Sequence, residues 1–338
     1  MTVGMTGYGT YVPEPTITGR EIAERSGIPE EVVVEKMGIE RKHVCPPDSD
    51  HVTDMGEEAA REALAGAGVN PEDLDLVLYH GSEFKDYIVW SAAAEIAHRI
   101  GATDAYANEM YALCAGAPLA LRSVSSRLEA GDIDVALLVA ASREEDLVEY
   151  TDEDASFMFN FGSGASAAVL ERDPGERILA EIHESAAITD GSFARDVIMP
   201  AGGSVHPPSP ETLDGGMHHL TVRDPDDMKE RLSPVTKANF LEVADTSLER
   251  SGFHREDVDF VALTHMKRSF HDELTAALGL DEEGSFYLSE HGHVQSADQL
   301  LAIDEVVGED RLESGDIVLF LAAGTGYTWA ASTLRWLD

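Results

Sequence analysis

The stretches LEAGDIDVALLVAAS at 128–142 and LESGDIVLFLAAGTG at 312–326 share one pattern in this chain of 338 residues. A second pair, NPEDLDLVLYHG at 70–81 and HREDVDFVALTH at 254–265, is related in the same way. In both pairs the two members are 184 positions apart. Two separate segments that repeat with one offset indicate that the chain is a duplicated unit.

Each repeat has the order helix, acidic turn, strand, central helix, Gly-Asp turn and strand. The strands are continuous apolar runs, such as VALLVAA at 135–141, which are typical of sheets covered by helices on both faces. The sequence therefore predicts an α/β protein with two similar halves, residues 1–172 and 173–338, that share a core. A segment rich in Gly, Pro, His and Asp, at about 202–230, is expected to contribute to a site or a subunit contact.

The composition is strongly acidic, with 64 Asp and Glu against 24 Lys and Arg and a formal net charge of −40. This charge disfavours nucleic acid and anionic membrane as partners. The acids are spread along the whole chain, so we expect a halophilic protein. In molar salt the screening length falls to about 3 Å, which removes most of the repulsion between the acidic side chains. The two cysteines, the absence of a signal-peptide pattern and the short apolar runs predict a cytoplasmic protein with no membrane span.

The candidate nucleophile is Cys114, in the segment YALCAGAPLAL at 111–121. A helix is predicted to begin near Cys114, with Pro118 in its first turn and Gly131 after its end. The free N–H groups at a helix N-terminus favour a thiolate. On local sequence alone, a small buried apolar side chain is an equally good interpretation of this cysteine.

Two histidines of the second half are candidate partners of Cys114. His265 ends the strand VDFVALTH, and His293 precedes the helix that corresponds to the one at Cys114. If the two central helices lie side by side, these three residues suit covalent acyl transfer, since thiolate attack needs a positioned imidazole. The alternatives are a surface position for His265 and a metal pair of His291 and His293. No histidine pair has the spacing and carboxylate of a zinc enzyme, so no metal is expected.

The chain resembles the thiolase superfamily, and most of all its ketoacyl synthase III and hydroxymethylglutaryl-CoA synthase branch. The resemblance implies two βαβαβαββ halves in a five-layered α-β-α-β-α sandwich, and a homodimer. Besides the Cys114 segment and His265, it is carried by GYGTYVPE at 7–14, MGIERKHV at 37–44, FGSGASAAVLE at 161–171, GHVQSAD at 292–298 and GTGYTWAASTLRW at 324–336.

The resemblance implies an acyltransferase of the 3-oxoacyl synthase type that needs no cofactor. Cys114 would accept an acyl group from CoA or an acyl carrier protein, and His265 would be the first catalytic histidine. The N–H groups of Cys114 and Gly326 would form the oxyanion hole. A malonyl or acyl thioester would then supply a carbanion that attacks the acyl-enzyme, as in fatty acid biosynthesis.

The sequence departs from the family pattern at three places. Ketoacyl synthase III has asparagine where this chain has His293, and a Cys-His-His set is similar to that of the elongating ketoacyl synthases. The segment HMKR at 265–268 lacks the asparagine that usually follows the first histidine. Val32 and Lys36 replace the tryptophan and arginine that hold the CoA adenine, so the acyl carrier stays open. The basic candidates for substrate binding are Lys36, Lys267 and Arg268.

Glu83 lies where hydroxymethylglutaryl-CoA synthases have their catalytic glutamate. This position favours an alternative, condensation without decarboxylation with Glu83 as the acid and base. The other interpretation of Glu83 is a surface acid among 64. An acyltransferase that passes the acyl group to a small amine or alcohol, and a non-catalytic subunit that keeps the fold, are further alternatives.

Overall fold

The main sheet has nine strands in the order β11-β12-β13-β8-β1-β7-β6-β4-β5. The structure is a computed structural model that describes residues 1–338. Its first half contains β1 (Val3–Tyr11), α2 (Val52–Ala67), β4 (Leu76–Tyr79), α3 (Ala92–Ile100), β5 (Tyr106–Glu109), α4 (Gly116–Ala130), β6 (Val135–Ser142) and β7 (Gly164–Arg172). Its second half contains β8 (Ala180–Thr189), α7 (Thr236–Ser251), β11 (Val258–Leu263), α8 (Arg268–Ala277), α9 (Asp298–Gly308), β12 (Ile317–Gly324) and β13 (Thr328–Trp336).

The strands confirm the duplication, because β1, β4, β6 and β7 correspond in order to β8, β11, β12 and β13. In the first half β4 pairs in parallel with β6 and with β5, and in the second half β11 pairs in parallel with β12. The other strand pairs of the sheet are antiparallel. The halves join where Gly4 and Met5 of β1 pair with Glu181 and Ala180 of β8. The boundary at residue 172 falls between β7 and β8, and its use as a domain boundary stays a prediction.

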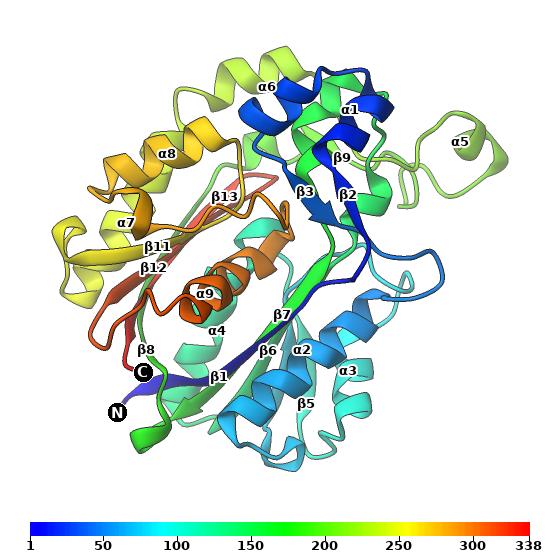
Figure 1. Ribbon diagram of the computed structural model, residues 1–338. Coiled ribbons are helices and arrows are strands. Elements are labelled where there is room, and N and C mark those ends of the chain that lie inside the picture. The colour runs from blue at the N-terminus through cyan, green and yellow to red at the C-terminus, as the bar shows by residue number, and fades with distance from the viewer.

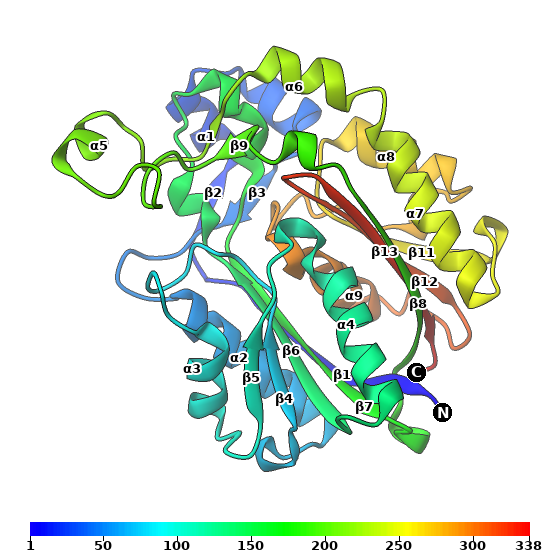
Figure 2. The ribbon, with the colours of Figure 1, turned by 180° about the vertical axis from the view of Figure 1, so that it is seen from behind.

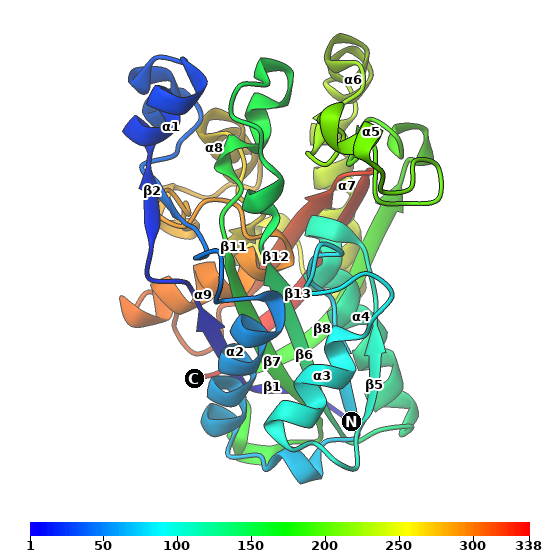
Figure 3. The same ribbon diagram turned by 90° about the vertical axis from the view of Figure 1, so that its right-hand side faces the viewer.

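Helices and strands form five layers (Figure 1). Helices α2 and α3 cover one outer face, α7 and α8 cover the other, and α4 and α9 lie between the two halves of the sheet. Figure 3 views the molecule from the side of α2 and α3, which lie in front of the strands of the first half. Side chains alternate accordingly along β6, where Leu138 points to the central layer and Leu137 and Val139 point to α2 and α3. The predicted five-layered sandwich is confirmed.

Two additions lie above the ends of the strands. The first is a small sheet of β2 (Thr16–Thr18) and β3 (Arg41–His43) beside α1 (Gly19–Ser26). The second is the segment that contains β9 (Val197–Ile198), α5 (Pro210–Asp214), β10 (Thr221–Val222) and α6 (Pro225–Leu232). Figure 2 shows α5 projecting away from the layered body. No helix is long and apolar enough to cross a membrane.

Candidate active site

Cys114 lies in a single 3₁₀ turn, Leu113–Ala115, that leads into α4. The prediction of a helix beginning near this cysteine is confirmed. The preceding residue, Leu113, has a φ of 51°, a left-handed conformation that is uncommon for a residue with a side chain. The thiol is buried, with 5% of the residue exposed. The sharp turn fixes the cysteine at the end of the helix rather than along its side.

The backbone around Cys114 is packed against the end of β12. A Cβ atom on Gly324 would lie 2.5 Å from the carbonyl oxygen of Ala112 and 3.1 Å from the backbone nitrogen of Cys114. Only a glycine therefore allows β12 to approach the cysteine turn this closely. Two residues later, Gly326 has a φ of 106° in the turn that connects β12 to β13. Its N–H as part of an oxyanion hole stays a prediction.

His293 is the histidine next to the thiol, with its Nε2 2.9 Å from Cys114 Sγ. On the other side of the ring, Nδ1 lies 2.6 Å from Oδ2 of Asp298. A carboxylate can only accept a hydrogen bond, so we assign the Nδ1 proton to His293 and the accepting role to Asp298. The three side chains thus form a line of sulfur, imidazole and carboxylate, the arrangement that activates a nucleophile.

Asp298 also connects the two histidines. Its Oδ2 accepts a second hydrogen bond from the backbone N–H of His265 over 2.7 Å, and its Oδ1 accepts one from the N–H of Val294. The side chain of Asp298 is fully buried. One carboxylate therefore orients the ring of His293 and fixes the end of the strand that carries His265.

The two histidines differ in protonation. Burial opposes the charged form of His293, but Asp298 and the sulfur of Cys114 hold its pKa well above the usual value. For His265, burial and the neighbouring histidines lower the pKa well below the usual value. Neither ring nitrogen of His265 has a hydrogen-bond partner in the protein. The site thus combines a basic imidazole beside the sulfur with a neutral imidazole that is free to bind a ligand.

Two cavities meet at the thiol, because both are lined by Cys114, Phe161 and Thr325. The larger, of about 680 Å³, is bounded by the loop after β4 and by the segment that follows β8. The other, of about 540 Å³, is the one that contains His265 and His293. Its walls are mostly apolar and come from residues that include Phe157, Met228, Phe240, Met266, Phe270 and Tyr327. We call these the large cavity and the histidine cavity.

Sequence comparison places this site in a known family. The family described as 3-oxoacyl-[acyl-carrier-protein (ACP)] synthase III matches residues 109–191, and the description of its C-terminal part matches residues 248–336. Together the two matches span both the cysteine turn and the histidines. The chain belongs to the 3-oxoacyl-ACP synthase III family.

Full-length relatives and solved structures agree with this assignment. A β-ketoacyl-ACP synthase III of Chlamydia pneumoniae is 27% identical over 328 residues, 97% of this chain and 95% of that protein. The priming β-ketosynthase of the R1128 polyketide pathway has a TM-score of 0.86 and 25% identity, covering 100% of this chain and 97% of its own. The 3-oxoacyl-ACP synthase III of Aquifex aeolicus VF5 has the same fold, with a TM-score of 0.84, 24% identity and coverage of 99% and 100%.

Glu83 is the proposed acid of the alternative reaction. In this member of the synthase III family it lines the large cavity and is exposed. A second carboxyl on the same wall, Glu144, is buried and was not among the sequence candidates. Its Oε1 accepts a hydrogen bond from Ser82 over 2.8 Å, and burial raises its pKa. The only sequence signal for Glu144 was its position two residues after the apolar strand that ends at residue 142.

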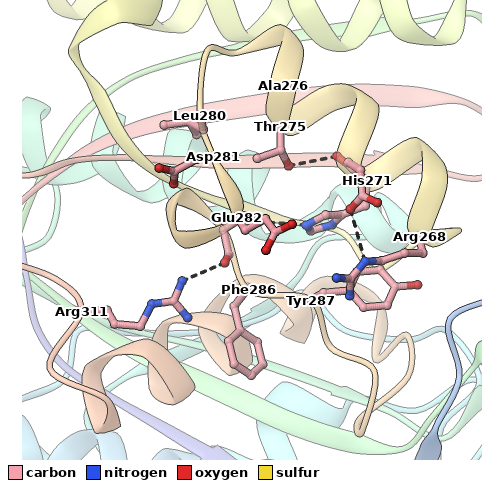
Figure 4. Close-up of a pocket in the computed structure, with 12 residues that line it drawn as sticks. Arg268, His271, Thr275, Ala276, Leu280, Asp281, Glu282, Phe286, Tyr287 and Arg311 are labelled. Carbon is pink, nitrogen blue, oxygen red and sulfur yellow. Dashed lines mark hydrogen bonds and ion pairs between the residues drawn. The ribbon is translucent and has the colours of Figure 1, made fainter.

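The three basic candidates lie in different places. Lys267 lines the histidine cavity, and Lys36 is exposed and lines neither cavity at the thiol. Arg268 lines a third cavity of about 480 Å³, where its guanidinium carbon lies 4.5 Å from the centre of the Tyr287 ring (Figure 4). Tyr287 lines that cavity and also packs against His265, and the centres of the two rings are 4.7 Å apart. A role in substrate binding stays a prediction for all three.

Asp298 was the main omission of the sequence analysis, although it lies in the quoted segment GHVQSAD. It is the first residue of α9, whose first six residues, 298–303, are all buried. Acids are common in the first turn of a helix because they interact favourably with its dipole, so the position of Asp298 gave no specific signal. No group of three or more His, Cys, Asp or Glu side chains is arranged to hold a metal ion.

Proposed function

We propose that this protein is an acyl-thioester condensing enzyme in which Cys114 carries the acyl group, and His265 and His293 act with it. The observation that supports this most directly is the 2.9 Å approach of His293 Nε2 to Cys114 Sγ, with Asp298 behind the ring. Family membership makes an acyl-transferring condensing enzyme the expected class.

In the first half-reaction, His293 takes the proton of Cys114 and the thiolate attacks the carbonyl carbon of an acyl thioester. The new bond joins the Cys114 sulfur to the acyl carbon, and the bond to the carrier sulfur breaks. His293 then returns its proton to the departing thiolate of the carrier. The N–H groups of Cys114 and Gly326 would stabilise the negative oxygen that forms in between.

In the second half-reaction, a malonyl or acyl thioester forms a carbanion that attacks the acyl carbon and releases the thiol of Cys114. The negative charge of the carbanion lies mainly on its thioester oxygen. His265 suits the stabilisation of this oxygen, because a neutral ring without a partner in the protein has an N–H to donate.

The carrier of the acyl group is proposed to be CoA or an acyl carrier protein, both of which end in a phosphorylated pantetheine arm. The apolar histidine cavity suits such an arm. Lys229 and Lys267 lie on its wall, in a chain with only 24 Lys and Arg against 64 acids. Two lysines in this position favour binding of a phosphate group at the entrance. The proposed reaction uses no cofactor.

A homodimer is part of this proposal. Three large exposed apolar side chains are consecutive in one loop, Tyr87, Ile88 and Val89; Tyr87 and Ile88 line the large cavity, and Val89 is 99% exposed. Strand β5 is the last strand of its side of the sheet and leaves an edge without a partner. Apolar loops next to an open strand edge favour association with a second copy. We also propose a cytoplasmic location and adaptation to molar salt, on the basis of the charge of −40.

The runner-up reaction uses Glu83 as the acid and base in a hydroxymethylglutaryl-CoA synthase-like condensation. The comparisons do not favour it, but Glu83 lines the same cavity as Cys114. The variant Glu83→Ala separates the two reactions. It should abolish condensation with acetoacetyl-CoA if Glu83 is the base, and it should leave decarboxylation of malonyl thioesters almost unchanged.

Intact-mass measurement with a panel of acyl-CoAs in molar KCl tests the proposal. We expect an acyl adduct on the wild type, none on Cys114→Ala, and release of CO₂ from a malonyl thioester by the acylated enzyme. A folded wild type that forms no adduct with any member of the panel would contradict both condensation reactions.

A further inference from the structure

Two residues that line the histidine cavity have buried polar atoms with no partner in the protein. One is His265, whose ring nitrogens both lack a hydrogen bond, and the other is Asn160, whose side-chain oxygen Oδ1 lacks one. Both residues are more than nine-tenths buried, with 4% of His265 and 8% of Asn160 exposed. Buried polar groups are nearly always hydrogen-bonded, so two such groups in one cavity indicate that a polar atom of a ligand completes them.

The backbone of Asn160 is fixed beside His293. Asn160 is the last residue of the 3₁₀ helix Glu153–Asn160, and its carbonyl oxygen accepts a hydrogen bond from the N–H of His293 over 2.7 Å. Two residues later, the N–H of Gly162 donates to the carbonyl oxygen of His293 over 2.9 Å. These bonds involve only backbone atoms, so the side-chain amide of Asn160 takes no part in them.

Both ring nitrogens of His293 already have a partner. Its Nδ1 lies 2.6 Å from Asp298, and its Nε2 lies 2.9 Å from the sulfur of Cys114. The carboxylate and the sulfur hold the pKa of His293 well above its usual value, so this ring is suited to remain paired with a thiolate. An oxygen that becomes negative elsewhere in the cavity therefore needs donors other than His293.

The side chain of Asn160 can supply such a donor. Its amide has two N–H bonds besides the oxygen. Because no residue holds that oxygen, the amide can turn about its Cβ–Cγ bond and direct its N–H groups at an oxygen of a ligand. The walls of the cavity are mostly apolar, and in such surroundings a donor stabilises a developing charge far more than it does in water.

We propose that Asn160 is a further catalytic residue of the condensation, whose side-chain amide holds the thioester oxygen of the second substrate together with the ring of His265. With a malonyl thioester, the carboxylate leaves as CO₂ and its bonding electrons pass to that oxygen. The enolate carbon then attacks the acyl carbon, a C–C bond forms, and the bond to the Cys114 sulfur breaks and leaves a thiolate beside His293. Asn160 is not the asparagine of the family pattern, whose place His293 takes. The inference rests on the proposed function for the acyl-Cys114 intermediate.

The variants Asn160→Leu and Asn160→Asp test this role. Leucine has nearly the size of asparagine without its donor, and aspartate keeps its shape but only accepts hydrogen bonds when it is ionised. Neither variant removes the backbone bond to His293. The matched control is Asn239→Leu, at a half-buried asparagine of α7 that lines neither cavity at the thiol. Circular dichroism in molar KCl checks that each variant is folded.

The measurement separates the two half-reactions. Intact mass with an acyl-CoA gives the rate of acylation, and enzyme that is already acylated gives the rates of CO₂ release and product formation when malonyl-CoA is added. We expect condensation to fall about 100-fold in Asn160→Leu, and at least as much in Asn160→Asp, because a carboxylate repels an oxygen that becomes negative. Acylation should stay within a few-fold of wild type in both variants. Asn239→Leu should match the wild type in both half-reactions.

The inference is wrong if a folded Asn160→Leu or Asn160→Asp condenses within a few-fold of the wild type. It is also wrong if either variant loses acylation as strongly as condensation, because equal losses indicate a structural role. One folded variant is sufficient for this decision, and the two place opposite demands on the site, since one side chain is apolar and the other is polar. Failure of the proposed function is distinguishable, because the wild type itself then forms no adduct, or forms an adduct that releases no CO₂ from malonyl-CoA.

Discussion

His293 Nε2 lies 2.9 Å from Cys114 Sγ, although the two residues are 179 positions apart. The cysteine comes from the turn before the central helix of the first half, and the histidine from the segment before the central helix of the second. The first half therefore contributes the cysteine and the second half contributes both histidines. Neither half contains the site by itself.

The roles of the two histidines should separate by half-reaction. His293→Gln removes the base beside the sulfur, so the rate of acylation by an acyl-CoA should fall about 100-fold. His265→Gln should leave acylation within a few-fold of wild type and lower the condensation rate, because His265 is expected to act on the second thioester. Time-resolved intact mass measures acylation, and product analysis measures condensation. Equal effects of both variants on acylation would contradict this division.

The close approach of β12 to the cysteine turn should tolerate no side chain at residue 324. In Gly324→Ala the new Cβ would meet backbone atoms of Ala112 and Cys114 that cannot rotate away. We expect the free energy of unfolding to fall by about 1–3 kcal/mol and acylation of Cys114 to be strongly reduced.

The matched control for this position is Gly308→Ala at the end of α9, where an added Cβ has no neighbour within 4 Å. It should leave acylation unchanged and should not lower stability, because alanine favours a helix over glycine by up to about 1 kcal/mol. If Gly324→Ala were acylated as fast as the wild type, the turn would be able to shift without loss of the nucleophile.

Lys42 should make stability depend on pH above neutrality. Its side chain is completely buried and donates to the carbonyl oxygen of Phe161, which lines both cavities. Burial lowers its pKa from 10.5 to about 7. Between these two pKa values the unfolded chain binds more protons than the folded one, so stability rises with pH across that window. Below about pH 7 Lys42 is protonated in both states, and the full cost of burying its charge lowers the stability of the folded protein.

The expected slope is about 1.4 kcal/mol per pH unit at most. Denaturant unfolding of wild type and Lys42→Met between pH 7 and 9 measures it, with Lys36→Met as a control at an exposed lysine. The wild type should gain stability with pH relative to Lys42→Met. Parallel curves for the two proteins would mean that Lys42 is not protonated differently in the folded and unfolded states.

Salt should stabilise this protein strongly. With a net charge of −40, most acidic side chains have no cation with which to pair, and their repulsion opposes the compact state. The screening length falls from about 10 Å at 0.1 M salt to about 3 Å at 1 M. We expect the melting temperature to rise steadily from 0.1 to 2 M KCl. A melting temperature that does not change with KCl would disprove the halophilic adaptation.

Much of the fold was predictable because its signals are local. A strand that is covered on both faces is apolar throughout, as β6 and β12 are. A helix that ends in a glycine with positive φ, as α4 does at Gly131, shows its boundary in the sequence. The repeat predicted two similar α/β halves, the family resemblance implied the five layers, and the structure confirms both.

The sequence by itself determined the duplicated α/β scaffold, the cysteine at the start of a helix and the two histidines as its candidate partners. Only the tertiary structure decided that Asp298 holds both histidine segments, that Arg268 faces another cavity, and that two cavities meet at the thiol. The physical reason is that apolar periodicity is imposed by the backbone geometry of each segment. Contacts between side chains of different halves depend on how the packed layers are placed against each other, which no single segment encodes.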